Sequence, residues 1–394
     1  VTSPMKKVDG KLVEISWNEA IDIAAKELKK ASDNAGFIST AGITNEDAFA
    51  LKRLAADIVK TKNIDTTVSL YGDKETILCS TADIDSADMF VVIDFDPSQW
   101  KRILAGVDAT IRKKVNGGAK LVTINSSETA LGSVATVELI GDPVETLKSF
   151  IKGIIDKGLS STADLSSAVA GATVTEEIEK AATLFVSAKN PVVITCPAMY
   201  SAASNLALFK GAVLSVPIES NAKGVLLMGL TTEGKTYKEM VEGATKLLYV
   251  VGNVPVKIAP KVDFLIVQNS HLTELAKQAD LVLPSATFWE DDGSIVDYLG
   301  NLKFICQAVE PPVEVMANTE IFENIAKAMG AEIEEVSDEE LDKLTKYECK
   351  ICFRPIVRKE GWDVKMDEMM ELLNSPVINS TRLVWLKSVE QASV

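Results

Sequence analysis

Two cysteines near the C-terminus, Cys349 and Cys352, have a spacing known from metal sites. A Cys-x-x-Cys pair supplies two thiolates to zinc or to an iron–sulfur cluster, and such sites use four ligands. The sequence contains no second pair of this kind, so the chain alone offers half a site. We interpret the two residues as packing or surface thiols and leave open a metal that a partner subunit completes.

Few other residues have the chemistry of a catalytic group. His271 is the only histidine, and no activated nucleophile is placed beside it, so we expect its ring to bond backbone at a strand end. Glu290, Asp291 and Asp292 could serve acid–base chemistry or bind Mg²⁺. Their loop context favours a solvated acidic turn instead. We therefore predict no catalytic residue in this chain.

Several apolar runs end abruptly in polar residues, as buried strands of a parallel sheet do. Residues 281–283 are entirely apolar, and Pro284, which has no N–H for a ladder, ends the run. Residues 89–95 lead in the same way to Asp96 and Pro97. Ligands of open α/β sheets bind outside the carboxyl ends of the strands, so any cofactor is expected there.

One local pattern occurs twice in the chain. Residues 246–255 parallel residues 86–97, and residues 263–270 parallel residues 120–126. The strands alternate with helical stretches, which is typical of an α/β protein. We predict two related, doubly wound and mostly parallel sheets lying side by side.

The same patterns predict four parts of the chain and several helix starts. The parts are an N-terminal segment with the first helix (1–35), a first α/β domain (36–158), a second α/β domain (159–312) and a peripheral C-terminal appendage (313–394). Ser16 with Glu19 forms a capping box for the first helix. Asn45 is predicted to cap the next helix, and Asp142 to cap one that begins at Pro143.

Composition narrows the function classes. A count of 41 Lys and Arg against 56 Asp and Glu gives a net charge of −15, which disfavours nucleic acid as a partner. No apolar run approaches the roughly 20 residues that cross a bilayer, and residues 1–7 lack the apolar core of a signal peptide. The five cysteines predict reduced thiols in the cytoplasm.

The order of several motifs resembles the molybdopterin oxidoreductase family. The segments that carry this resemblance are residues 2–20, 63–65, 87–97, 280–293 and 310–312. The family includes formate dehydrogenases, nitrate reductases and the G subunit of NADH:quinone oxidoreductase (complex I), whose domain of this type has lost the molybdenum. The resemblance implies a formate dehydrogenase-like fold in which two related sheet domains flank a pterin cleft.

Other positions depart from the family pattern. The family's metal ligand falls at Tyr71, whose phenol does not replace a soft thiolate, and the nearest cysteine is Cys79. Residues 94–97 read Asp-Phe-Asp-Pro where active members carry Gly-x-Asn-Pro, and carboxylates there oppose a polyphosphate. Residues 125–127 lack the Arg of the family's Asp-Pro-Arg. Only residues 252–255 keep the family loop.

These departures imply a scaffold with a degenerate and empty pterin cleft. Roughly eighty residues follow Pro312, which is too few for the further β-rich cofactor domain of catalytic members. We expect a non-catalytic scaffold or electron-transfer subunit of an NAD(P)H-linked iron–sulfur oxidoreductase complex, closest in character to the complex I G subunit. The alternatives are a fragment of an active molybdenum or tungsten bis-pterin oxidoreductase of the formate dehydrogenase type, and an α/β assembly factor without a redox role.

The resemblance also sets the expected cofactors and partners. No cofactor is expected in this chain, molybdopterin included, and iron–sulfur clusters are expected in an N-terminal domain before Val1 or in partner subunits. The partners would be flavin-bearing and iron–sulfur-bearing chains in the cytoplasm, through which any peripheral membrane attachment would run. If a pterin does bind, the residues expected to hold it are Gly252, Asn253, Asp280 and Asp297.

Overall fold

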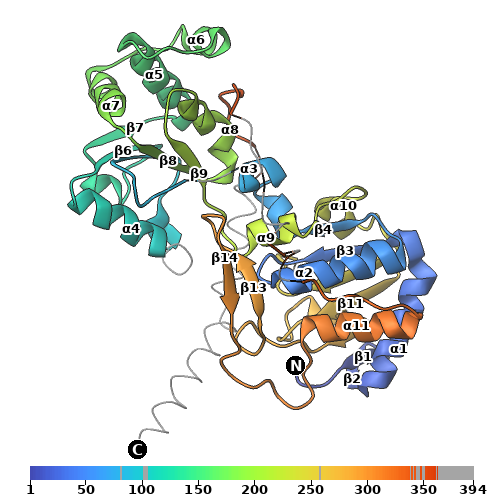
Figure 1. Cartoon of the computed structure of the whole chain (residues 1–394). Helices are drawn as coiled ribbons and strands as arrows, with labels where there is room; N and C mark the ends of the chain where they lie inside the picture. Colours follow the sequence, from blue (N-terminus) through green and yellow to red (C-terminus); the bar gives the residue numbers. More distant parts are fainter. Residues whose placement is uncertain are drawn as a thin grey trace, which may run out of the picture.

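The chain folds around two parallel β-sheets that lie in two adjoining bodies (Figure 1). The computed structural model describes residues 1–79, 82–100, 105–256, 259–337, 339, 341–342, 347, 351–360 and 362. One body contains β1–β4 and β10–β14, and the other contains β5–β9. This architecture confirms the predicted α/β class with parallel sheets.

The larger sheet has seven strands in the order β2-β1-β12-β11-β10-β3-β4. Its central strands are parallel, and the N-terminal hairpin of β1 and β2 adds an antiparallel edge. The bounds are β1 Met5–Val8, β2 Lys11–Glu14, β3 Ala35–Ser39, β4 Ile64–Thr66, β10 Leu247–Val251, β11 Phe264–Gln268 and β12 Leu281–Leu283. A separate hairpin pairs β13 Gly293–Val296 with β14 Leu302–Ile305.

The smaller sheet has five strands in the order β7-β6-β5-β8-β9, all of them parallel. Their bounds are β5 Met89–Ile93, β6 Lys120–Asn125, β7 Val137–Ile140, β8 Pro191–Thr195 and β9 Ala212–Ser215. Every residue of β5 and β8 is buried, which explains why these strands read as continuous apolar runs rather than alternating ones.

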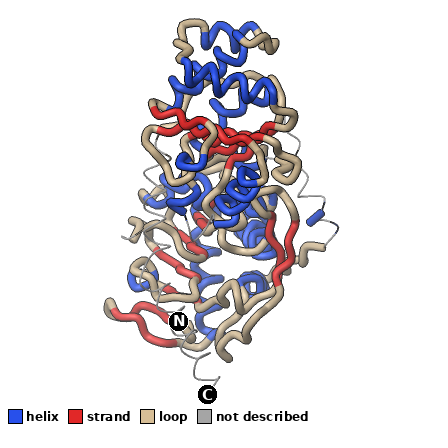
Figure 2. Tube along the Cα trace, turned by 90° about the vertical axis from the view of Figure 1, so that its left-hand side faces the viewer, coloured by secondary structure: helices blue, strands red, loops and turns tan. Residues whose placement is uncertain are grey.

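Helices lie on both sides of the strands of the smaller sheet (Figure 2).

The α-helices of both bodies are α1 Trp17–Ala31, α2 Asn45–Lys52, α3 Lys74–Leu78, α4 Ala105–Asn116, α5 Pro143–Asp156, α6 Ala163–Val169, α7 Glu176–Ser187, α8 Tyr200–Ala203, α9 Ala222–Leu227, α10 Tyr237–Val241 and α11 Asn318–Met329. A π-helical stretch, Arg53–Val59, continues α2. Short 3₁₀ turns occupy Ser32–Asn34, Thr67–Leu70, Pro97–Trp100, Gly132–Val134, Pro197–Met199, Ser204–Leu208 and Ala276–Gln278. None of the helices in the described ranges has the length and apolarity that a bilayer crossing needs.

The predicted helix starts are correct to within one residue. Ser16 accepts a hydrogen bond from the Glu19 N–H, but the Glu19 side chain pairs with Lys6, so only the Ser16 half of the expected capping box is seen. Asp142 caps α5 by accepting from the Glu145 N–H, with Pro143 in the first turn. The second helix is capped by Thr44 rather than by Asn45. Thr44 is the preferred cap because it forms a capping box with Asp47, three residues on: the Asp47 carboxylate also accepts a hydrogen bond from the Thr44 backbone N–H.

The sheets divide the chain differently from the boundaries expected at residues 36, 159 and 313. Strand β10 pairs with β3 along its whole length, so strands from both expected α/β domains share one sheet. The smaller sheet's core draws mainly on residues 84–216, an insertion between β4 and β10. Local apolar periodicity identifies buried strands but not their neighbours, which explains the different partition.

The segment after residue 313 is not peripheral throughout. Helix α11 packs against α1 and α2, and Ile321, Phe322 and Ile325 are fully buried in the core of the larger sheet. The amphipathic spacing of these side chains is that of an ordinary core helix. Residues 351–360, further along, contact the body of the smaller sheet.

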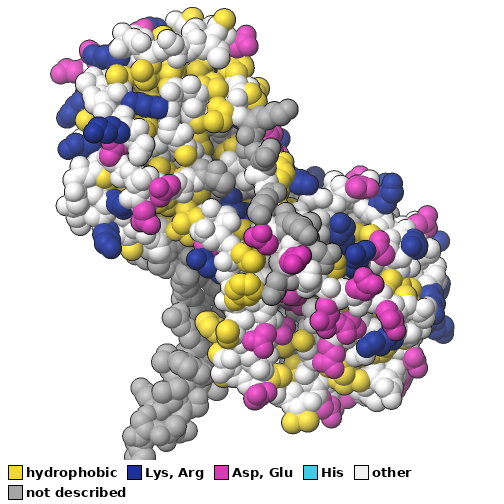
Figure 3. All heavy atoms as spheres, in the orientation of Figure 1, with side chains coloured by type: hydrophobic (Ala, Val, Ile, Leu, Met, Phe, Trp, Pro, Cys, Tyr) yellow, Lys and Arg dark blue, Asp and Glu magenta, His cyan; other side chains and the backbone are white. Residues whose placement is uncertain are grey.

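Acidic side chains are prominent on the body of the larger sheet. On the face shown in Figure 3, Asp and Glu side chains are spread over this body, with fewer Lys and Arg side chains among them. The net charge of −15 is therefore visible as an acidic surface on this face. Such a surface repels polyanions.

Candidate functional site

Each sheet contains one point at which the order of the strands reverses. In the larger sheet this point lies between β3 and β10, and in the smaller sheet it lies between β5 and β8. Ligands of open α/β sheets bind outside the carboxyl ends of the strands at such switch points. The candidate site is therefore the edge formed by the residues that follow β3, β4 and β10, and the equivalent edge follows β5 and β8.

The two switch points share one backbone feature. Gly252 after β10 and Asp94 after β5 both have positive φ, +77° and +49°. The Gly252 N–H donates to the Gln268 carbonyl on β11 at 2.9 Å, and the Asp94 N–H donates to the Ile124 carbonyl on β6 at 2.8 Å. The repeated sequence pattern thus corresponds to a repeated local structure. Asp is among the few residues besides Gly that adopt this conformation.

A glutamate carboxylate sits at the carboxyl ends of β3 and β4. Glu219 lies on the segment that leads from β9 to α9, and it accepts hydrogen bonds from the hydroxyls of Thr40 and Thr67 at 2.7–2.8 Å. The Ala41 N–H donates to the same carboxylate at 2.8 Å, and the Tyr71 hydroxyl donates at 3.0 Å. Four donor groups from two strand ends therefore converge on one anionic group.

Burial governs the electrostatics of this cluster. Burial raises the pKa of Glu219, and the hydrogen bonds from Thr67, Thr40, Ala41 and Tyr71 oppose that rise. Burial also raises the pKa of Tyr71 well above its ordinary value, and the nearby Glu219 charge adds to the effect. Tyr71 therefore stays a neutral phenol, and its proton serves the hydrogen bond to Glu219.

These residues do not fit the metal centre of a molybdopterin enzyme. Such a centre needs a thiolate, selenolate, serine or carboxylate oxygen free to ligate the metal. Tyr71, at the expected position, is fully buried, neutral and hydrogen-bonded. Cys79 is disulfide-bonded, and Glu219 is held by four donors. A neutral phenol is a poor ligand for a soft metal, so none of these three side chains is placed to ligate molybdenum or tungsten.

Asp280 lies apart from the other residues expected to hold a pterin. Gly252 and Asn253 both follow β10, and the Asn253 amide oxygen accepts from Asn269 at 2.9 Å. Asp280 lies before β12, at the opposite, amino edge of the sheet, where it accepts from the Leu265 N–H at 2.8 Å. Asp297 closes the β13–β14 turn by accepting from the backbone of residues 299 and 301 at 2.9 Å. Gly252 and Asn253 therefore lie at the candidate edge, whereas Asp280 does not.

The acidic turn at 290–292 is more structured than a solvated loop. Glu290 accepts from the Thr287 N–H at 2.8 Å, and Asp292 accepts from the Gln307 N–H at 2.7 Å. Burial raises the pKa of Asp291 to about 6. The ring of His271 was expected to bond backbone, but its Nδ1 lies 2.8 Å from the side-chain hydroxyl of Ser270.

Sequence reasoning missed the buried carboxyl of Asp47. Asp47 is 2% exposed, and its Oδ2 accepts from the Thr44 N–H and from the Asn318 side chain. Burial, with the Asp291 charge, raises the pKa of Asp47 to about 7. Its Oδ1 has no hydrogen-bond partner among the described residues. The Thr-x-x-Asp spacing predicts the helix cap at Thr44. It does not predict that Asp47 is buried, because α11, which supplies Asn318, is distant in sequence.

The cysteine predictions have mixed outcomes. Cys352 is free and exposed, and Cys349 lies outside the described residues. Cys196 and Cys306 form no disulfide, but the disulfide at Cys79 shows that the expectation of reduced thiols was wrong for that residue. Within the described ranges, no three His, Cys, Asp or Glu side chains are arranged to hold a metal ion.

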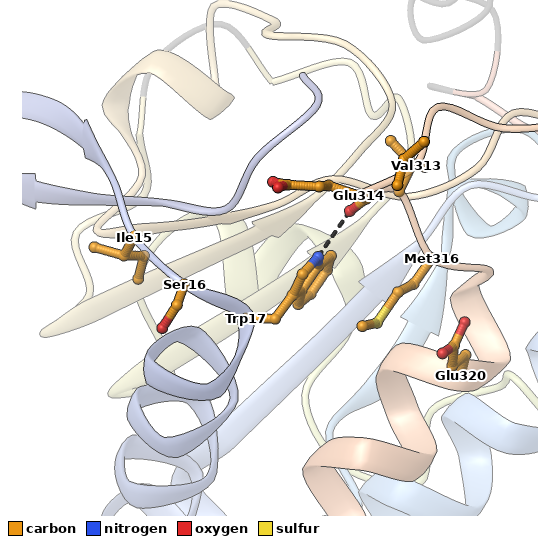
Figure 4. A pocket seen from close by; sticks show the side chains of 8 residues that line it. Ile15, Ser16, Trp17, Val313, Glu314, Met316 and Glu320 are labelled. Carbon is orange, nitrogen blue, oxygen red and sulfur yellow. Dashed lines mark hydrogen bonds between the residues drawn. The ribbon is translucent and has the colours of Figure 1, made fainter.

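A shallow pocket of about 380 Å³ lies away from these strand ends, where α1 begins (Figure 4). Trp17 lines it and donates through Nε1 to the Glu314 carbonyl at 2.7 Å. Met316 and Val313 add apolar surface. None of the residues that follow β3, β4 or β10 lines this pocket, so it does not belong to the candidate site.

Comparisons with known proteins place the fold and the sequence in one group. The family model for molybdopterin oxidoreductase matches residues 1–328. The F420-dependent formate dehydrogenase subunit alpha of Methanocaldococcus jannaschii is 26% identical over 84% of this chain and 62% of its own length. The NADPH-Fe(3+) oxidoreductase subunit alpha of Geobacter sulfurreducens is 24% identical over 80% of this chain and 48% of its own length.

A solved structure supports the same fold. Acetylene hydratase from Pelobacter acetylenicus superposes with a TM-score of 0.66 at 16% identity, covering 84% of this chain and 61% of that one. At that identity the likeness concerns the fold alone. The chain spans less than two thirds of the length of these relatives.

Proposed function

Because the chain belongs to the molybdopterin oxidoreductase family, we propose that it is a non-catalytic scaffold subunit of a larger, NAD(P)H-linked iron–sulfur oxidoreductase complex, similar in character to the complex I G subunit. Its pterin cleft is degenerate and filled by protein side chains. Its task is to pack against electron-carrying chains and hold them in place. The complex would act in the cytoplasm.

The observation that carries this proposal is the position of the Glu219 carboxylate. It takes up the hydroxyl and N–H donors at the ends of β3 and β4, which are the groups that an anionic ligand would use there. A phosphate group brought to the same edge would meet this carboxylate and the nearby Tyr71 phenol. Like charges at short range in a partly buried site cost several kcal/mol, so the side chain and a phosphate exclude each other.

Two further features support a subunit role. Relatives that match most of this chain are described as alpha subunits of oxidoreductases, one of them NADPH-linked. The net charge of −15 fits a chain whose surfaces steer the docking of partner chains during assembly.

Metal and pterin analysis tests the proposal. The protein is purified from its native cells, and molybdenum, tungsten and extractable pterin are quantified per chain. The proposal predicts far less than one equivalent of each. One equivalent of metal with pterin would overturn it.

The second candidate function is that of a fragment of an active bis-pterin oxidoreductase. The observation that favours it is the Gly252–Asn253 loop, which keeps the family pattern and the left-handed glycine.

Affinity capture from native extract separates a scaffold subunit from an assembly factor without a redox role. Co-purification of flavin- and iron–sulfur-bearing chains is expected, and recovery of the chain alone would contradict the subunit role.

A further inference from the structure

The switch point of the smaller sheet is lined by an acidic strand end. Asp94 follows β5 directly, and Cys196 follows β8 directly. The Cys196 thiol lies 3.8 Å from Asp94 Oδ2, so the two strand ends meet there. Asp96, only 9% exposed, adds a second carboxyl to the same strand end. Two acidic groups at this edge disfavour a phosphate ligand and favour a cation.

The chain's own C-terminal segment brings a cation to this edge. The Nε of Arg358 donates to Asp94 Oδ2 at 2.6 Å, and the pair is only 31% and 17% exposed. The next residue, Lys359, donates its backbone N–H to the Ala198 carbonyl just beyond β8 at 2.9 Å. The segment therefore bonds to the ends of both strands that flank the switch point.

Further contacts anchor residues 351–360 on both sides. The Arg354 N–H donates to the Asn205 amide oxygen at 3.0 Å, and the Asn205 amide donates back to the Arg354 carbonyl at 2.9 Å. Ile356 is 5% exposed within the smaller sheet's core. The Arg354 guanidinium pairs with Glu75 on α3 at 2.7 Å. Since α3 belongs to the larger sheet's core and Asn205 to the smaller sheet's body, the segment ties the two together.

We propose that the switch-point edge behind β5 and β8 is a guanidinium-binding site, which the chain fills in cis with Arg358, and that residues 351–360 form a strap that closes this edge. The site has the position of a nucleotide crevice but the opposite charge preference. It does not depend on the redox role proposed above, because it rests on contacts within this chain alone.

A guanidinium group suits this edge better than an ammonium group does. Its planar fork of N–H donors pairs with a carboxylate while its flat face tolerates apolar neighbours, and it is weakly hydrated. Asp94 offers the carboxylate, and the residues that follow β8 include Ala198 and Met199, which belong to the apolar core of the smaller sheet. The left-handed φ of Asp94 holds its carboxylate at the strand end, where Gly would offer no charge at all.

Amide hydrogen exchange of the full chain tests the proposal, with the Lys359 and Arg354 amides as reporters. Arg358→Ala removes an ion pair that is partly screened, so the Lys359 amide should exchange about fivefold faster. Methylguanidinium chloride should restore part of that protection as its concentration is raised, whereas sodium chloride at the same ionic strength should not. Arg53→Ala, which removes an exposed pair with Asp57 in the other body, is the matched control and should leave both amides unchanged.

Two further variants keep the test decisive. Arg358→Lys retains the charge without the fork and should protect Lys359 less well than arginine does. Asp94→Asn keeps a residue that tolerates positive φ. This variant should speed the exchange of the Lys359 amide as much as Arg358→Ala does, but methylguanidinium should not slow it again. Full protection by lysine, rescue by sodium chloride, or an Arg358→Ala variant with unchanged exchange would each overturn the proposal.

Discussion

The Tyr71 hydroxyl lies 3.0 Å from Oε2 of Glu219, across 148 residues of sequence and across the point where the chain returns from the smaller sheet to the larger one. Tyr71 occupies the position at which the family resemblance puts a metal ligand. The hydrogen bond turns that position into part of a closed polar cluster. The consequence for stability can be measured directly.

Removing the Tyr71–Glu219 bond should destabilise the protein. Tyr71→Phe leaves Glu219 with three of its four donors and should lower the free energy of unfolding by about 2 kcal/mol, because the acceptor is charged. Glu219→Gln should also destabilise, by roughly 1–3 kcal/mol, since an amide offers only one acceptor oxygen to these donors. Urea unfolding followed by circular dichroism measures both.

The direction of the Glu219→Gln effect separates a structural cluster from a functional one. Functional sites often hold charged groups at a cost in stability, so neutralising a ligand-binding carboxylate commonly stabilises a protein. Glu19→Gln, in an exposed pair with Lys6, is the matched control and should change stability by less than about 0.5 kcal/mol. A stabilised Glu219→Gln variant would contradict the structural role.

Gly252 should not tolerate a side chain. Its φ of +77° disfavours an L residue, and an added Cβ would lie 2.3 Å from Cγ2 of Thr40. Gly252→Ala should therefore cost more than the roughly 1–2 kcal/mol that the backbone conformation alone demands. Gly300→Ala is the control, because Gly300 has a φ of +89° with no atom within 4 Å of the added Cβ.

The excess cost at Gly252 should be relieved by a second change. Thr40→Ser removes the clashing methyl group and keeps the hydroxyl that donates to Glu219. A double-mutant cycle on thermal unfolding should therefore give a favourable coupling between Gly252→Ala and Thr40→Ser. Additive effects would show that the methyl contact does not set the cost.

Asp47 should make stability fall as pH rises. Burial raises its folded pKa to about 7, above the ordinary value of 3.8, so the folded state binds the proton more tightly than the unfolded state does. Stability from this group is therefore largest below pH 4 and is lost as pH rises towards 7. Asp47→Asn should remove this dependence and stabilise the protein by roughly 2–4 kcal/mol at pH 8, with little effect near pH 4.

Asp65 provides the contrast for that prediction. Burial raises the pKa of Asp65 as well, but both of its oxygens accept backbone N–H groups, from Thr66 and Tyr237. In Asp65→Asn the amide nitrogen must face one of these donors, so this variant should destabilise at every pH. Asp47 tolerates the change because its Oδ1 faces no donor in the described residues. Equal behaviour of the two variants in urea titrations at pH 5 and pH 8 would refute this account.

The local elements and the family could be predicted from the sequence, because they depend on short-range patterns. Strand β12 ends just before Pro284, as predicted. The repeated patterns at 86–97 and 246–255 contain β5 and β10. Strand neighbours depend on distant contacts instead. Nothing near residue 35 signals that β3 will pair with the distant β10 as well as with the nearby β4.

The candidate site was predictable only in part for the same reason. Tyr71 was identified from its position in the motif, but its partner Glu219 lies in a linking segment without any motif. Asp280 was expected at the cofactor edge, yet the direction of β12 puts it at the opposite edge. Arg358 lies in a segment that was expected to be peripheral, yet it pairs with Asp94. From the sequence, Asp94 was considered only as a carboxylate that repels a polyphosphate.

The central claim is that protein side chains fill the switch-point cleft of the larger sheet. A high-resolution density map of the chain, purified with its partners from native cells, tests it most directly at Glu219. The account predicts continuous density from the Tyr71 hydroxyl to the Glu219 carboxylate, with Thr40 and Thr67 bonded to the same group. Pterin density between the ends of β3 and β10, with Glu219 displaced from Tyr71, would contradict it.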